Sequence, residues 1–184
     1  MSSKFRVNKK SLKQAHGQAA QNRQKSTDLN YAMELHRAGR LDEAAAIYKS
    51  VLESDPQNSE ALHLLGVIAS QSGKAGEAVA LISKAIAINP NQAQYYDNLG
   101  VVYMNVNKPE TAAVYHRKAL EIDPAYGMAH YNLGVSCHAT GRADEALHHF
   151  REAVNINPNH YDARNNLAMI LCEQGFYTEA IDAE

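Results

Sequence analysis

Histidine is the residue type here with the widest potential for chemistry, since nine occur in the chain. Imidazoles ligate metals and transfer protons near neutral pH. Their spacing argues against both roles. His148 and His149 are adjacent, and adjacent side chains on a helix point to different faces, which makes joint chelation difficult. His36 and His138 occupy the same position of a recurring pattern. We therefore expect neither a metal site nor a cofactor.

The sequence also lacks the arrangements that are typical of covalent or phosphate chemistry. Cys137 and His138 are neighbours whose side chains diverge on a helix. The glycines mark breaks between apolar segments instead of forming a phosphate-binding loop, and no serine lies in a nucleophile elbow. We expect that this chain is not an enzyme.

The most informative polar pattern is a row of asparagines at one position of a repeated segment. The row consists of Asn30, Asn98, Asn132 and Asn166, and Leu64 takes the place in the second segment. Asparagine has only moderate helix propensity, because its side chain competes for backbone hydrogen bonds. Three interpretations are open: duplication of an ancestral repeat, bracing of neighbouring helices by the amides, or binding of a ligand.

The ligand interpretation uses the amide's paired donor and acceptor, which match a peptide bond. The predicted groove residues are Asn30, Asn98, Asn132, Asn166, Asp97, Tyr131, His63 and Asn165. No lysine or arginine occupies the candidate groove positions, so we do not expect a clamp for a terminal carboxylate. Acids and tyrosines there favour a neutral or basic extended peptide.

These residues belong to segments with the apolar spacing of helices. Tyr131, Leu133, Gly134 and Cys137 recur three or four apart in one segment, and Gly141 then breaks the pattern. A second segment carries apolar residues toward the same side and is closed by a proline. The unit is therefore a pair of helices joined by a short turn.

This unit recurs at a fixed interval of 34 residues, which the prolines make visible: Pro56, Pro90, Pro124 and Pro158. A constant period of this size predicts a solenoid of stacked units. We expect ten helices and no strand, in repeats at about 25–58, 59–92, 93–126, 127–160 and 161–184, the last incomplete.

Local signals place the helices inside each unit. Left-handed turns are expected at Gly39, Gly73, Asn107, Gly141 and Gly175. Pro109 suits a first helical position, where its missing N–H costs nothing. The first helix should run over about 26–38. The second helices should bury Ala44, Tyr48 and Val51, then Ala78, Ile82 and Ala85, then Ala146, Phe150 and Ala153.

The period, the small residues and the alanines together resemble the tetratricopeptide repeat (TPR) family. The resemblance covers about residues 25–184 and implies an all-α, right-handed superhelix that serves as a protein-binding scaffold. The asparagine row is similar to the ladder in the TPR region of O-linked N-acetylglucosamine transferases. The segments ALHLLGVIASQSG and YYDNLGVVYMN also look like bacterial relatives of those enzymes. This second resemblance implies an alternative function, substrate docking within a larger glycosyltransferase or sulfotransferase.

Charge is distributed unevenly. Seven basic residues precede Asp28, the first acid. Residues 1–24 show no helical stripe, and we expect a flexible basic tail. The alternatives are a helix that caps the first repeat and binding of nucleic acid or a membrane surface through the basic residues. No apolar run spans a membrane, and the two cysteines have no zinc spacing, so a reducing, cytoplasmic location is expected. Uncovered ends of the array suggest possible self-association, including exposure or fraying of residues 177–184.

Overall fold

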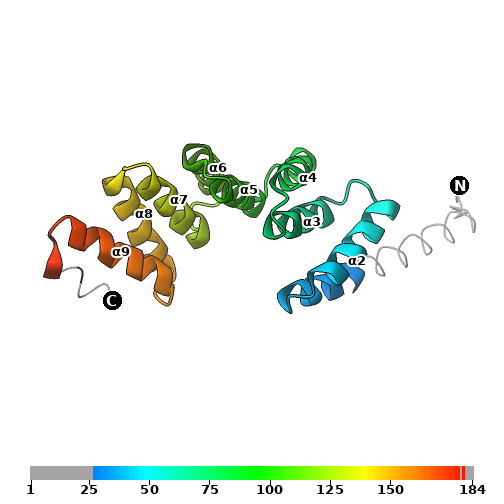
Figure 1. The fold of residues 1–184 in the computed structure, drawn as a ribbon, viewed down its shortest axis with the longest axis horizontal. Helices are drawn as coiled ribbons and strands as arrows, with labels where there is room; N and C mark the ends of the chain where they lie inside the picture. Colours follow the sequence, from blue (N-terminus) through cyan, green and yellow to red (C-terminus); the bar gives the residue numbers. More distant parts are fainter. Residues whose placement is uncertain (1–26, 179, 181–184) are drawn as a thin grey trace, which may run out of the picture. The chain divides into compact units, whose positions relative to one another are not determined.

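The computed structural model describes residues 27–178 and 180, and every regular element in that part of the chain is a helix. Figure 1 shows them following one another in chain order, without a sheet. The predicted all-α fold is confirmed. The tail at 1–24 and most of the segment 177–184 lie outside the described residues, so what was expected of them stays a prediction. Ala180 is described and is only 3% exposed, so the expected exposure is wrong at this residue.

Residues up to Ala61 form one compact unit. Its described part holds a helix over residues 27–37 and α2, Leu41–Ser54. The first helix was predicted to end at residue 38, and the described helix ends at residue 37. Ala44, Tyr48 and Val51 are the buried residues of α2, as their spacing indicated. They pack the second helix against the first through one apolar stripe.

Residues from Leu62 onward form the second unit. It begins within α3, Ser59–Gln71, and continues with α4, Ala75–Ile88, and α5, Ala93–Asn105. After these come α6, Pro109–Ile122, and α7, Gly127–Ala139. The last two are α8, Ala143–Ile156, and α9, Tyr161–Glu173. From α4 onward each helix packs on the next one along the chain.

The turns between the paired helices have the backbone that their residues predicted. Gly39, Gly73, Gly141 and Gly175 have φ between 74° and 83°, and Asn107 has φ of 57°. Asparagine is the residue after glycine that best tolerates this left-handed conformation, and here it replaces the glycine of the other turns. Pro109 follows and opens α6.

Glycine allows the paired helices to approach closely. A Cβ atom added at Gly134 would lie 2.7 Å from Cε1 of Phe150, and one added at Gly66 would lie 2.7 Å from Cγ1 of Ile82. At Gly100 the added atom would collide with the ring of His116. In each pair, the missing side chain makes room for the large central residue of the second helix.

Candidate functional site

In the second unit, the asparagine row lies on three successive first helices. Asn98 is on α5, Asn132 on α7 and Asn166 on α9, and all three are half-buried. The first helices α5 and α7 also contact each other directly, whereas the second helices α6 and α8 do so less. Asn98 and Asn132 therefore lie on two first helices that contact each other.

Each amide of the row bonds to a side chain on the preceding first helix. Nδ2 of Asn98 lies 2.7 Å from Nε2 of His63, and Nδ2 of Asn132 donates to both carboxylate oxygens of Asp97 at 3.1 Å. A hydrogen bond also joins Asn166 on α9 to Tyr131 on α7. It opposes the rise in the pKa of Tyr131 that burial and Asp162 cause. The partners of Asn98 and Asn132 each lie 35 residues earlier in the chain. These hydrogen bonds support the interpretation that the amides brace neighbouring helices.

Asp97 joins three helices. Besides Asn132 on α7, its carboxylate binds Nδ1 of His116 on α6 at 2.8 Å. Side-chain exposure is 0% for His116 and 3% for Asp97. Nε2 of His116 is buried without a hydrogen-bond partner. This polar group occupies the slot that Ile82 and Phe150 fill in neighbouring pairs.

Two of the predicted groove residues are almost completely buried. Asp97 and His63 are each 2% exposed, and the ring of His63 stacks on Tyr95 with centroids 4.4 Å apart. Their side chains contact neighbouring helices, so little of either surface is open to a ligand. The sequence alone could not reveal this, because other positions of the same helices carry equally polar residues at the surface.

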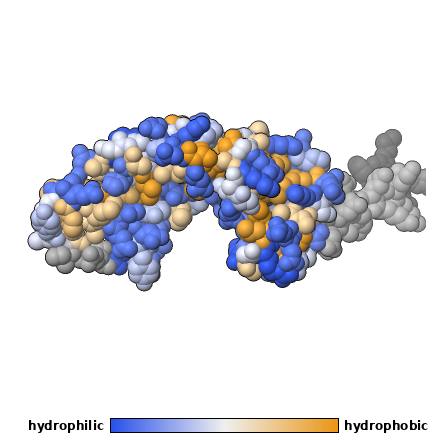
Figure 2. All heavy atoms as spheres, viewed as in Figure 1, coloured by the Kyte–Doolittle hydropathy of each residue, from blue (hydrophilic) through white to orange (hydrophobic). Residues whose placement is uncertain are grey.

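The other predicted residues remain accessible. Asn165 is exposed on α9, Tyr131 is half-buried on α7, and Asn30 is exposed in the first unit. Met128, at one of the candidate groove positions, is 45% exposed on α7, and Met169, which sequence reasoning missed, is 40% exposed on α9. The sequence signal that could have indicated such a residue is a large apolar side chain at a position outside the buried stripe of its helix. Figure 2 shows apolar side chains interrupting a largely hydrophilic face.

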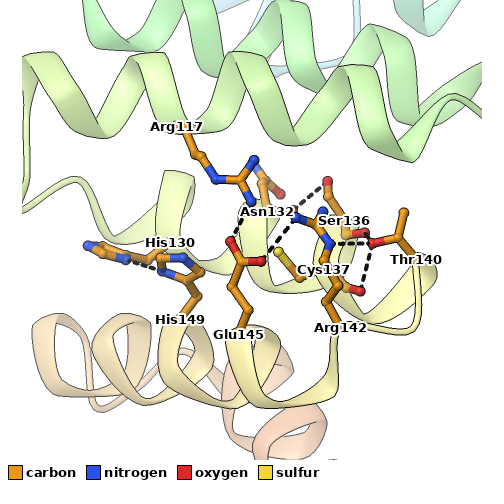
Figure 3. Close-up of polar contacts among 9 residues, drawn as sticks. All are labelled: Arg117, His130, Asn132, Ser136, Cys137, Thr140, Arg142, Glu145 and His149. Atoms are coloured by element: carbon orange, nitrogen blue, oxygen red, sulfur yellow. Dashed lines mark hydrogen bonds and ion pairs between the residues drawn. The ribbon is translucent and has the colours of Figure 1, made fainter.

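A second polar cluster links α6, α7 and α8 (Figure 3). Nδ1 of His130 lies 3.1 Å from Nδ1 of His149, and Nε2 of His130 lies 3.0 Å from the carbonyl oxygen of Pro124. Arg117 forms an ion pair with Glu145, which also binds Arg142 at 3.0 Å. The sequence offered no sign of this cluster, because its members come from three helices.

Burial sets the protonation of the cluster. It lowers the pKa of His149 from 6.5 to about 4, with His130 and His148 adding to the effect. Burial and then Glu145 raise the pKa of the Cys137 thiol to about 11, which keeps that thiol protonated and unreactive. Among the described residues, no group of three or more histidines, cysteines and acids is placed to hold a metal ion.

Comparison with protein families gives a consistent match. Tetratricopeptide repeat families match residues 35–99, 93–126, 127–160 and 149–182. A search of curated proteins returned no match. None of the described helices is both long enough and apolar enough to span a membrane.

Several solved structures have a similar fold. Pseudomonas aeruginosa PilF superposes with a TM-score of 0.83 at 19% identity, over 89% of this chain and 75% of PilF. MamA gives a TM-score of 0.71 at 24% identity, over 83% and 89% of the two chains. YrrB, described as a TPR protein with an unusual peptide-binding site, gives 0.65 at 23% identity, over 91% and 87%. At these identities the similarity concerns the fold.

Proposed function

Since this chain belongs to the tetratricopeptide repeat family over residues 35–182, we propose that it is a protein-binding scaffold that holds an extended peptide along α5, α7 and α9. The observation that carries this proposal is the row of half-buried amides at one position of three successive first helices. A peptide-binding site in YrrB, a protein of similar fold, supports it.

The bracing bonds are compatible with ligand binding. An asparagine amide can donate two hydrogen bonds and accept up to two. The contacts of Asn98 and Asn132 engage Nδ2, so each Oδ1 keeps its acceptor capacity. The bonds also fix the side-chain conformation in advance, which lowers the entropy lost when a ligand binds.

Neighbouring side chains indicate the chemistry of the ligand. Met128 and Met169 offer adaptable apolar contacts, and Asn165 adds an exposed amide. Asp162 is exposed on the same helix as Asn165 and Met169. We propose a neutral or basic peptide with apolar side chains, held mainly through its backbone.

The experiment begins with selection of linear peptides from a displayed random library, followed by titration of the best binder. Asn165→Ala should raise Kd about twofold to tenfold, the loss expected for one hydrogen bond. Asn155→Ala is the matched control, because Asn155 is equally exposed but lies on the second helix α8. If no selected peptide distinguishes Asn165→Ala from Asn155→Ala, the proposed surface is not the binding site.

A second candidate function rests on the similarity of the row to the asparagine ladder of O-linked N-acetylglucosamine transferases. In that case the repeats would present a substrate protein to a glycosyltransferase or sulfotransferase domain. Sequencing the gene past the codon for Glu184 separates the two functions, since a catalytic domain there favours substrate docking.

A further inference from the structure

A hollow of about 450 Å³ lies between α6, α7 and α8, and the asparagine row does not line it. Its walls include Leu120, Pro124, Leu133, Arg117, His130 and His149. The volume lies within the range of small-ligand sites, which extends from about 300 to 1,000 Å³. Three of these residues are apolar. The other three are held in place by a hydrogen bond or an ion pair.

The hydrogen bonds determine which nitrogen of His149 is available. A carbonyl oxygen only accepts, so His130 must donate its Nε2–H to Pro124. In the neutral ring of His130, Nδ1 is then a lone pair and accepts the Nδ1–H of His149. The neutral ring of His149 is left with an unprotonated Nε2. Because His149 lines the hollow, its ring brings a hydrogen-bond acceptor to it.

Arg117 adds a fixed cationic plane. Its guanidinium is held by Glu145, and its side chain is 41% exposed. A guanidinium that is held in place and partly exposed attracts the face of an aromatic ring. Tryptophan gives the strongest attraction.

We propose that this hollow binds a tryptophan side chain of a protein partner, with the indole between the apolar walls and Arg117 and its N–H donated to Nε2 of His149. An aliphatic side chain would leave the acceptor of His149 unpaired when it displaced water. A carboxylate would be repelled by that lone pair and by Glu121, an exposed acid that also lines the hollow. Indole combines an apolar body and a large π face with an N–H that only donates, whereas the tyrosine hydroxyl also accepts.

The state of His149 supports this assignment. Because burial keeps its pKa near 4, Nε2 remains a lone pair at neutral pH. The groups that act on His149 are His130, His148, Glu145 and Arg117. Glu145 and Arg117 are paired with each other, so the acceptor is stable across the physiological range.

The test uses the whole chain and the blocked tripeptide Gly-Trp-Gly, followed through the methyl NMR resonances of Leu120 and Leu133. We expect saturable shifts at these methyls with Gly-Trp-Gly and none with Gly-Leu-Gly. Replacing tryptophan by 1-methyltryptophan removes the N–H donor and should weaken binding about twofold to tenfold. Equal binding of the two peptides would overturn the role of His149.

Variants make the assignment specific. His149→Phe keeps an aromatic ring but removes the acceptor, so it should bind both tryptophan peptides equally. His149→Gln restores an acceptor and should recover the preference for tryptophan over 1-methyltryptophan. Asn155→Ala, on the same helix, should behave as wild type. Should His149→Phe fail to fold, the two peptides compared on the wild-type protein still decide.

Two further outcomes would overturn the proposal. One is the absence of saturable shifts at Leu120 and Leu133. The other is binding of free tryptophan without binding of the blocked tripeptide, because the source would then be a metabolite. Neither outcome bears on the asparagine row, so the proposed peptide surface stands or falls separately.

Discussion

Asp97 is the residue on which the polar contacts of the second unit converge. One carboxylate bonds to His116 within its own helix pair and to Asn132 in the next. Removing this carboxylate leaves the buried His116 and the amide of Asn132 without their acceptor, which costs about 1–3 kcal/mol for each group. We expect Asp97→Ala to lower the free energy of unfolding by that amount in a urea titration. The exposed Asp162 provides the control, and Asp162→Ala should change it by no more than about 0.5 kcal/mol.

His149 should make stability depend on pH in a defined window. Its pKa is about 4 in the folded protein and 6.5 when unperturbed. Between these values the unfolded chain binds more protons, so stability falls as pH drops from 6.5 toward 4. At about pH 5 the loss attributable to His149 is up to about 2 kcal/mol. Chemical unfolding at neutral pH and at about pH 5 should show a smaller difference for His149→Gln than for wild type. Identical differences would contradict the shifted pKa.

At the scale of the helices, the closest contacts depend on the absence of a side chain. Gly134 on α7 faces the ring of Phe150 on α8, so Gly134→Leu should overpack this contact and cost about 1–3 kcal/mol or more. Gly76 on α4 has no atom within 4 Å of an added Cβ. Gly76→Leu should therefore be neutral or stabilising, because leucine favours helix more than glycine. Similar denaturation midpoints for the two variants would exclude the close contact.

Most of the helical architecture could be predicted because each element carries its own local signals. The turn at Asn107 was evident from its place in the period and from Pro109 two residues later, and its φ is 57°. The buried faces of α2, α4 and α8 followed from apolar spacing. The tenth predicted helix lies largely outside the described residues.

The whole second unit shows why the candidate site was harder to predict than the fold. The period indicates that Asn98, Asn132 and Asn166 lie on successive helices. Whether a polar residue beside them is buried depends on the partners that the stacking supplies. Asp97 is buried because His116 and Asn132 satisfy its carboxylate, whereas Asn165, at the same position of its repeat, remains exposed. The hollow beside His149 likewise exists only when three helices meet.

The central claim is that a peptide binds along the first helices, and the side-chain amide NMR resonances of asparagine test it most directly. The selected peptide is titrated into labelled protein while Asn98, Asn132, Asn165, Asn166 and the control Asn155 are followed. We expect saturable shifts of the first four with a common Kd, and no shift of Asn155, which is exposed on α8. Unchanged resonances of those four at saturation, with shifts confined to α6 and α8, would contradict the account.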